Sequence, residues 1–376
     1  MSADLPPPSP RRIRSSPRLC SLSWLPLLAA LSLTPRGLRG VEPARAEPAT
    51  APAVSTADEA PRPLPRRLSG FAMSPYFERP SEGLRFLELI DELAETGARD
   101  ISLTVHWSQQ NISSTEIAPD PRETRSDALI LSLMRRARAR GLRVMLFPIL
   151  WLQEQAIGAW RGTIRPSDEA RWWASYRRFI FHYAQLAARG GAQLFSVGSE
   201  LSSMEGREQR WRQLIAEVRE RFSGELIYSA NWDHYHEVTF WSALDRIGFT
   251  GYYILSEHAQ PTLSQLRARW EGIRQRIEAW PGRGGRPVVF TEVGYPSIDG
   301  ASMRPWDYTG DRPVDLEEQR LCFEAFRQVW SQSPILDGVY FWNWWGPGGP
   351  NDRWYTLRGK PALATVQRFL NEFQSE

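Results

Sequence analysis

Two glutamates stand at the ends of short apolar runs in this sequence. Glu200 follows the run LFSVGS at 194–199, and Glu292 follows VVFT at 288–291. Either carboxylate alone has an ordinary structural explanation, such as a helix cap or an ion pair. The pair points to chemistry, because hydrolysis of a glycosidic bond needs one carboxyl group to protonate the leaving oxygen and another to attack the sugar or to activate water.

The elements around these glutamates predict how they are positioned. From Leu68 onward, short apolar runs alternate with helical stretches, as in βα units around a parallel sheet. Strands are expected at 69–74, 100–106, 143–150, 194–197, 225–230, 247–252, 288–291 and 338–342. Helices are expected at 82–96, 127–140, 167–189, 207–222, 240–244, 262–280, 315–333 and 361–374, the fifth being barely a turn. Eight units in about 300 residues predict an α/β fold with one catalytic domain, a (β/α)8 TIM barrel.

A barrel of this kind would bring the two glutamates together. Active sites of such barrels lie at the C-terminal ends of the strands. The fourth and seventh strands face each other across an eight-stranded barrel, so we expect Glu200 and Glu292 to converge on one cleft. Carboxyl groups about 5 Å apart would give retention of configuration at the sugar carbon, and a wider separation would give inversion.

Aromatic side chains cluster at the same predicted strand ends. The chain has 17 Trp, more than one domain core ordinarily needs. We expect a sugar-binding platform at these ends, formed by His106, Trp107, Trp151, Asn231, Trp232 and the run from Trp342 through Trp345, which includes Trp344. Sugars present flat C–H faces that stack on aromatic rings, while their hydroxyls pair with amide or indole groups. Each Trp alone is also explained by core packing, and Trp107 and Trp342 are the strongest candidates.

The residues around both glutamates resemble those of a known family. The segments SVGSEL at 196–201 and FTEVGY at 290–295 are similar to motifs of glycoside hydrolase family 113, which belongs to clan A. The likeness extends from about Gly70 to Phe369 and includes YFWNW at 340–344. The resemblance implies a retaining mechanism in which Glu200 is the general acid/base and Glu292 the nucleophile. It also implies β-1,4-mannan as the leading substrate.

Two further site residues take their expected roles from the resemblance. Many clan A enzymes have Asn immediately before the acid/base, where it binds the sugar 2-hydroxyl, whereas this chain has Ser199. Ser199 is expected at the substrate with a shorter hydroxyl, and this departure leaves the exact sugar open. A tyrosine at the end of the sixth strand commonly orients the nucleophile in the clan. Tyr252 is the first choice and Tyr253 the alternative, because alternation along a strand lets only one of them point inward.

Other kinds of functional site find little support in the sequence. The segment DHYH at 233–236 offers two histidines that could ligate zinc, but no third distant ligand is evident, so we expect no metal and no cofactor. Cys322, the only cysteine after the N-terminal segment, lies on an apolar helical pattern that indicates core packing. Neither a serine-hydrolase elbow nor a nucleotide-binding glycine motif occurs. The basic residues are almost all Arg and are scattered along helices, so we expect no nucleic-acid partner, and no protein partner is evident.

The first 67 residues do not have the pattern of the barrel. Residues 1–46 combine several Arg, an apolar run at 19–33 and the tripeptide ARA at 44–46, which are the parts of a secretory signal. Residues 47–67 are rich in Pro and Ala, which predicts a disordered tether before the domain at 68–376. The expected location is secreted or periplasmic. An uncleaved N-terminal segment that anchors the protein to a membrane is the alternative.

These observations together predict a retaining glycoside hydrolase that cleaves a β-linked polysaccharide or oligosaccharide, most simply an endo-β-1,4-mannanase. Two alternatives remain open at this point. One is a glycosidase or transglycosylase acting on another β-glycan or on a cell-wall glycan. The other is a barrel that binds carbohydrate without catalysis, against which the presence of both glutamates argues.

Overall fold

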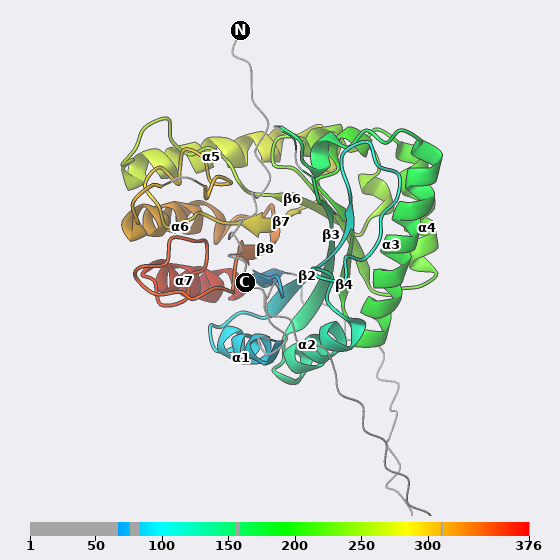
Figure 1. Cartoon of the computed structure of the whole chain (residues 1–376). Coiled ribbons are helices and arrows are strands. Elements are labelled where there is room, and N and C mark those ends of the chain that lie inside the picture. The colour runs from blue at the N-terminus through cyan, green and yellow to red at the C-terminus, as the bar shows by residue number, and fades with distance from the viewer. Residues whose placement is uncertain (1–66, 76–82, 155, 157, 310, 376) are drawn as a thin grey trace, which may run out of the picture. The chain divides into compact units, whose positions relative to one another are not determined.

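A closed barrel of parallel strands forms the centre of the domain. The computed structural model describes residues 67–75, 83–154, 156, 158–309 and 311–375, and in this part of the chain eight strands pair in sequence order (Figure 1). The strands are β1 (Leu68–Met73), β2 (Asp100–Gln109), β3 (Arg143–Leu152), β4 (Leu194–Ser199), β5 (Glu225–Ala230), β6 (Arg246–Thr250), β7 (Val288–Val293) and β8 (Leu336–Trp342). Pairing of β1 with β8 closes the barrel. The predicted signal and residues 47–66 of the predicted tether lie outside the described residues.

Helices surround the strands, as Figure 1 shows. They are α1 (Gly83–Ala94), α2 (Asp127–Ala139), α3 (Glu169–Gly190), α4 (Glu208–Arg219), α5 (Leu263–Ala279), α6 (Leu316–Trp330) and α7 (Ala362–Gln374). The connection between β5 and β6 has only short 3-10 turns, one of them η5 (Trp241–Ala243). The predicted (β/α)8 barrel is therefore confirmed, including the fifth helix that the sequence reduced to a turn. Within the described residues, no helix combines the length and the apolar character that a membrane span requires.

The helix before β4 begins and ends at residues that satisfy its backbone. The side chain of Asp168 accepts a hydrogen bond from the backbone N–H of Arg171 at 3.0 Å, which caps the first turn of α3. Gly191 ends the helix with a φ of 67°, a left-handed conformation that glycine adopts without a steric penalty. These caps fix the point at which the chain enters β4, the strand that leads to Glu200.

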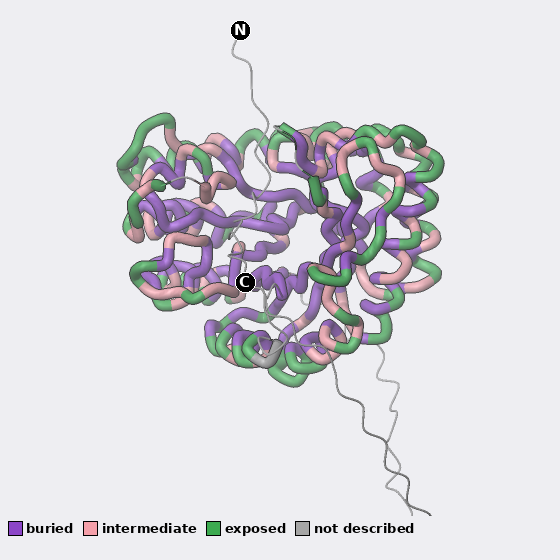
Figure 2. The backbone as a smooth tube through the Cα atoms, in the orientation of Figure 1, coloured by how far each residue is buried: buried purple, intermediate pink, exposed green. Residues whose placement is uncertain are grey.

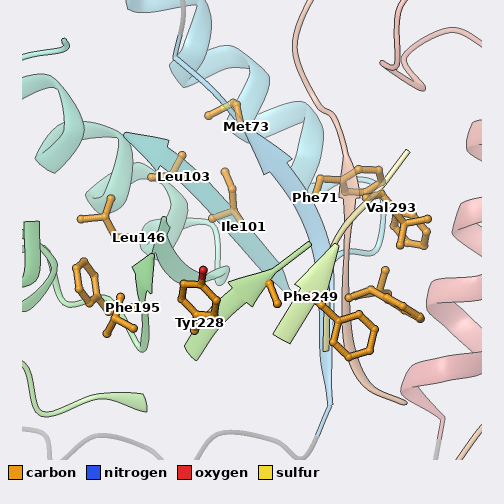
Figure 3. Packing of buried hydrophobic residues seen from close by; sticks show 14 of the residues in the cluster. Phe71, Met73, Ile101, Leu103, Leu146, Phe195, Tyr228, Phe249 and Val293 are labelled. Carbon is orange, nitrogen blue, oxygen red and sulfur yellow. The ribbon is translucent and has the colours of Figure 1, made fainter. Parts of the chain in front are cut away.

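Several strands carry continuous apolar runs because both of their faces are buried. On β3, Val144 and Leu146 pack toward the helices, whereas the alternating residues Met145 and Phe147 belong to the cluster inside the barrel. Figure 2 shows the strands as buried tube, and Figure 3 shows part of the cluster between sheet and helices, with Phe71 among its labelled residues. A parallel sheet covered on both faces has this continuous pattern. A well-packed barrel leaves only the strand ends for function.

Two strand boundaries near the site differ from those that the sequence predicts. Strand β7 continues to Val293, so Glu292 lies within the strand rather than after it. Strand β6 ends at Thr250, so Tyr252 lies in the following loop. The ladder between β6 and β7 shifts its register at this point, and Gly251 N–H donates to the backbone oxygen of Glu292 at 2.6 Å. The loop after β6 therefore stays beside the end of β7.

Candidate active site

A cavity of about 340 Å³ lies at the C-terminal ends of the strands. Its walls are mostly aromatic, and its lining residues are Ile149, Trp151, Trp160, Arg161, Glu200, Asn231, Trp232, Tyr252, Glu292, Trp306, Tyr308, Trp342, Asn343, Trp345, Trp354 and Tyr355. The two glutamates and one arginine are the charged residues of this lining. An aromatic cavity with a few converging polar groups is typical of a binding site for a small molecule or a sugar unit.

Glu292 enters the cavity from the end of β7 and is 4% exposed. The phenol of Tyr252 donates a hydrogen bond to Oε2 of this carboxyl group at 2.8 Å. The other oxygen, Oε1, is buried and has no hydrogen-bond partner among the described residues. Burial raises the pKa of Glu292 to about 8, with a further rise from the nearby charge of Glu200, while Arg161 and the Tyr252 hydrogen bond oppose the rise.

Glu200 follows β4 in a left-handed conformation, with a φ of 51°. Such a φ is uncommon outside glycine and marks a locally strained backbone. Arg161 donates to Oε2 of Glu200 at 2.6 Å, and the hydroxyl of Thr250 donates to Oε1 at 3.3 Å. Thr250 is also the register partner of Glu292 in the β6–β7 ladder. Thr250 at the end of β6 therefore lies beside both glutamates.

A buried hydrogen-bond chain holds the backbone just after Glu200. The N–H of Leu201 donates to the Tyr228 hydroxyl at 2.9 Å, and that hydroxyl donates to Glu205 at 2.6 Å. His234 Nδ1 contacts the other oxygen of Glu205 at 2.5 Å. Burial raises the pKa of Glu205, and the hydrogen bond that His234 donates to this carboxylate raises the pKa of His234. This series of hydrogen bonds links the loop after β5 to the backbone beside Glu200, the strained residue at the end of β4.

Both histidines of the DHYH segment at 233–236 contact carboxylates of the protein. His234 is engaged by Glu205, and His236 lies 3.3 Å from Glu237, its neighbour in sequence. One acidic group in the described residues, formed by Asp299, Asp315 and Glu318, brings carboxylate oxygens within 4.8 Å of one another. Glu318 accepts hydrogen bonds from the N–H groups at 300 and 302, and Asp315 caps α6. These hydrogen bonds to backbone N–H groups explain why Asp315 and Glu318 lie close together.

Six of the residues predicted to form the site line the cavity: Glu200, Asn231, Trp232, Tyr252, Glu292 and Trp342. Trp151, Asn343 and Trp345, also expected on the platform, line it as well. Tyr252 rather than Tyr253 reaches Glu292, since Tyr253 packs against Trp232 and the buried Trp270.

Four predicted positions are corrected by the structure, because their side chains do not line the cavity. Trp107 on β2 faces α3, where its ring packs against Phe179 and His182. Trp344 is buried in the core, with its ring against Phe71 and its indole N–H donating to the backbone oxygen of Leu89 at 2.9 Å. Ser199 is 2% exposed, and its hydroxyl is enclosed without a hydrogen-bond partner among the described residues. His106 is likewise buried outside the cavity.

Several lining residues were not predicted from the sequence. They are Trp160, Arg161, Trp306, Tyr308, Trp354 and Tyr355. All come from the long connections after β3, β7 and β8, which have no apolar period to indicate which side chains point inward. The high Trp content was the sequence signal that could have indicated further aromatic lining residues. Trp306, for example, stacks on Trp232 with 5.9 Å between ring centroids and extends the aromatic wall.

Comparisons with known proteins agree with this geometry. The sequence model of Glycoside Hydrolase Family 113 matches residues 85–353. The chain is 29% identical to the GH113 β-mannanase AaManA from Alicyclobacillus acidocaldarius, solved in complex with ManMIm, with a TM-score of 0.73 over 82% of this chain and 98% of that chain. A solved GH113 β-1,4-mannanase is 25% identical, with a TM-score of 0.71 over 81% of this chain and 99% of that chain.

More distant structures share the fold alone. A β-glucuronidase from Ruminococcus gnavus, solved with D-glucuronic acid, is 13% identical, with a TM-score of 0.53 over 81% of this chain and 49% of that chain. No sequence among curated proteins matches the chain. Because the family model spans most of the described barrel, the chain belongs to Glycoside Hydrolase Family 113 and is a glycoside hydrolase.

Proposed function

We propose that the protein is a retaining β-1,4-mannanase of the endo-acting type, with Glu200 as the general acid/base and Glu292 as the nucleophile. The observation that carries the proposal is the environment of Glu292. One oxygen of its buried carboxyl group is held by Tyr252, and the other has no partner among the described residues and belongs to a residue that lines the cavity. A nucleophile needs this combination of a fixed orientation and an available oxygen.

The first chemical step follows from these positions. Oε1 of Glu292 attacks the anomeric carbon of a bound sugar, and the bond from that carbon to the leaving oxygen breaks. Glu200 gives its proton to the leaving oxygen, so the departing sugar leaves as an alcohol. The product of this step is a sugar bonded to Glu292. In the second step, Glu200 takes a proton from water, whose oxygen attacks the same carbon and releases the sugar with its original configuration.

The proton inventory of the site is consistent with this division of roles. Burial raises the pKa of Glu292 to about 8, so this carboxyl group carries a proton near neutral pH in the free protein. Attack requires that this proton be on Glu200 and that Glu292 be ionised. A sugar hydroxyl that donates to Oε1 favours the ionised form of Glu292, because a hydrogen bond to a carboxylate stabilises its charge.

The neighbouring cation and the raised pKa belong to different carboxyl groups of this site. In the structure the guanidinium of Arg161 contacts Glu200, and the raised pKa belongs to Glu292. The physical reason is the burial of Glu292, whose Oε1 has no donor among the described residues.

The choice of mannan rests on two considerations. The aromatic walls supply flat faces on which sugar rings stack, with Trp342 and Trp232 on different sides of the strand ends. The solved relatives at 25–29% identity carry the names of β-mannanases. A polymer of this kind occurs outside the cell, so the proposal includes export by the signal-like segment at 1–46.

The test is to incubate the purified full chain with β-mannan, β-glucan, xylan and peptidoglycan and to measure new reducing ends. Release from mannan in large excess over the other polymers supports the proposal. Release mainly from another polymer would assign a different glycosidase, and binding without release would indicate a carbohydrate-binding barrel. Glu200→Ala must abolish the release, and Glu257→Ala, which removes an exposed carboxylate, must leave it unchanged.

A further inference from the structure

Asn343 stands at the end of β8 and lines the cavity, although it is 5% exposed. Its Oδ1 is buried and has no hydrogen-bond partner among the described residues. A buried carbonyl oxygen without a donor loses the hydrogen bonds that water gave it in the unfolded chain, and native structures seldom tolerate this loss without a reason.

The amide of Asn231, on the other side of the cavity, provides a contrast. Its Nδ2 donates to Asp233 at 2.6 Å, and its Oδ1 lies 3.5 Å from the Thr250 hydroxyl, whose single hydrogen it shares with Glu200. Asn231 is therefore held by the protein. Among the described residues that line the cavity, the buried oxygens without a partner are Oδ1 of Asn343 and Oε1 of Glu292. Both are acceptors, so the ligand that suits them must bring hydrogen-bond donors.

The two unpartnered oxygens come from neighbouring strands. Strand β7 pairs with β8 through Val293 and Phe341, next to Glu292 and two residues before Asn343. Beyond the strands the chains stay in contact, since a side chain at Gly294 would meet the backbone oxygen of Trp342 at 2.6 Å. Glu200 lies at the end of β4, on the opposite side of the barrel. Asn343 thus belongs to the side of the cavity that holds the nucleophile.

We propose that Asn343 determines sugar specificity by accepting a hydrogen bond, through Oδ1, from a ring hydroxyl of the sugar unit that becomes bonded to Glu292. The inference rests on the proposed function and names the group that recognises the sugar at that site. The hydroxyl of the substrate supplies a hydrogen-bond donor to this amide oxygen, which has no donor among the described residues. Binding of the sugar therefore gives the buried acceptor its missing hydrogen bond. A sugar without that hydroxyl leaves the acceptor unsatisfied and should bind less tightly.

The variant Asn343→Leu tests the proposal, because leucine has a similar size and no polar atoms. We expect kcat/KM for mannohexaose to fall about tenfold to a hundredfold, the range for one hydrogen bond to a buried acceptor. We expect the midpoint of thermal unfolding to stay the same or to rise, since the variant removes an unsatisfied polar group. A purely structural role predicts a lower midpoint. Asn371→Leu, on the exposed face of α7, is the matched control and should change neither quantity.

A second measurement keeps the proposal falsifiable even if the variant is unstable. Aryl β-mannobiosides that lack one hydroxyl at a time on the sugar next to the aryl group are compared in the wild-type protein and in Asn343→Leu. The wild type should discriminate against one analogue, and the variant should lose that discrimination. Equal discrimination in both proteins overturns the role of Asn343 while the mannanase proposal stands. Failure of the wild type to hydrolyse mannohexaose overturns the proposed function instead.

Discussion

The Tyr252 hydroxyl lies 2.8 Å from Oε2 of Glu292 and leaves Oε1 as the oxygen of that carboxyl group without a hydrogen-bond partner among the described residues. Tyr252 stands in the loop after β6, and its position depends on the backbone bond from Gly251 to the oxygen of Glu292 itself. The tyrosine and the glutamate are therefore placed by the same local structure. Burial and the charge of Glu292 raise the pKa of the Tyr252 phenol, so it stays a donor through the neutral range.

Tyr252→Phe should lower kcat by about a hundredfold, the scale found when one preorganised donor is removed from an active site. The phenyl ring keeps the packing while the hydrogen bond that orients the carboxylate is lost. KM should change little, because the interaction concerns the reacting group. Steady-state kinetics on mannohexaose check this, with circular dichroism to verify the fold. A variant with unchanged kcat would show that the phenol does not orient the nucleophile.

The division of roles between the glutamates predicts opposite products in azide rescue. Glu200→Ala and Glu292→Ala should each lower turnover of mannohexaose by orders of magnitude, since each removes a distinct step. With an activated aryl mannoside, azide should restore activity to Glu200→Ala and give the β-glycosyl azide, because Glu292 still forms the intermediate. Azide should give the α-product with Glu292→Ala. Nuclear magnetic resonance of the products distinguishes these cases, and an α-product from Glu200→Ala would reverse the assignment.

The guanidinium of Arg161 should set the acidic limb of the pH profile. The proposed mechanism requires ionised Glu292, so kcat/KM should rise with pH through the pKa of this group, and the charge of Arg161 lowers that pKa. Arg161→Gln removes the cation and should therefore move the acidic limb to higher pH, with the largest loss of activity on the acidic side. The other titratable groups that face Glu292, namely Glu200, Tyr252 and Tyr355, remain in place.

The measurement is kcat/KM for mannohexaose across the pH range for the wild type, Arg161→Gln and Arg165→Gln. Arg165 is exposed on the same connection and serves as the matched control. An unshifted limb in Arg161→Gln would refute the electrostatic role, and a loss that is uniform with pH would assign Arg161 to positioning of Glu200 alone.

The barrel and the positions of the two glutamates were predictable from the sequence because they depend on local patterns. Continuous apolar runs mark strands that are buried on both faces, and a carboxylate at the end of such a run is conspicuous. The direction of an individual side chain near a strand end was less predictable. Trp342 lines the cavity and Trp344 packs in the core, although the two lie only two residues apart. Beyond the last ladder bond, the alternation that fixes direction no longer holds.

The long connections were beyond prediction for a related reason. Arg161 lies in the 3-10 turn η2 (Arg161–Thr163), in a connection without a hydrophobic period, and its contact with Glu200 joins residues far apart in sequence. Nothing in the local composition distinguishes it from the exposed Arg165. The sequence places Asn343 within an aromatic run at a predicted strand end. It does not show that the Oδ1 of this residue lacks a hydrogen-bond partner, because that depends on the packing of the surrounding loops.

Lys360, the only lysine of the chain, should be essential to the stability of the loop that carries Trp354 and Tyr355. Its ammonium group is fully buried and donates to Ser297 Oγ at 2.7 Å, to Asp352 Oδ1 at 2.8 Å and to the backbone oxygen of Trp354 at 2.7 Å. Removing one partner of a buried ion pair leaves the other charge uncompensated in a medium that solvates it poorly.

Lys360→Met should therefore lower the free energy of unfolding by about 3–5 kcal/mol, the usual cost of breaking a buried pair. The double variant Lys360→Met/Asp352→Asn should recover part of that loss, because it removes the stranded carboxylate. Denaturant titration followed by Trp fluorescence measures both, with Arg304→Met as an exposed control. If the single variant is as stable as the wild type, the ion pair does not hold this loop. If the double variant is less stable than the single one, the cost lies in the lost hydrogen bonds rather than in the charge.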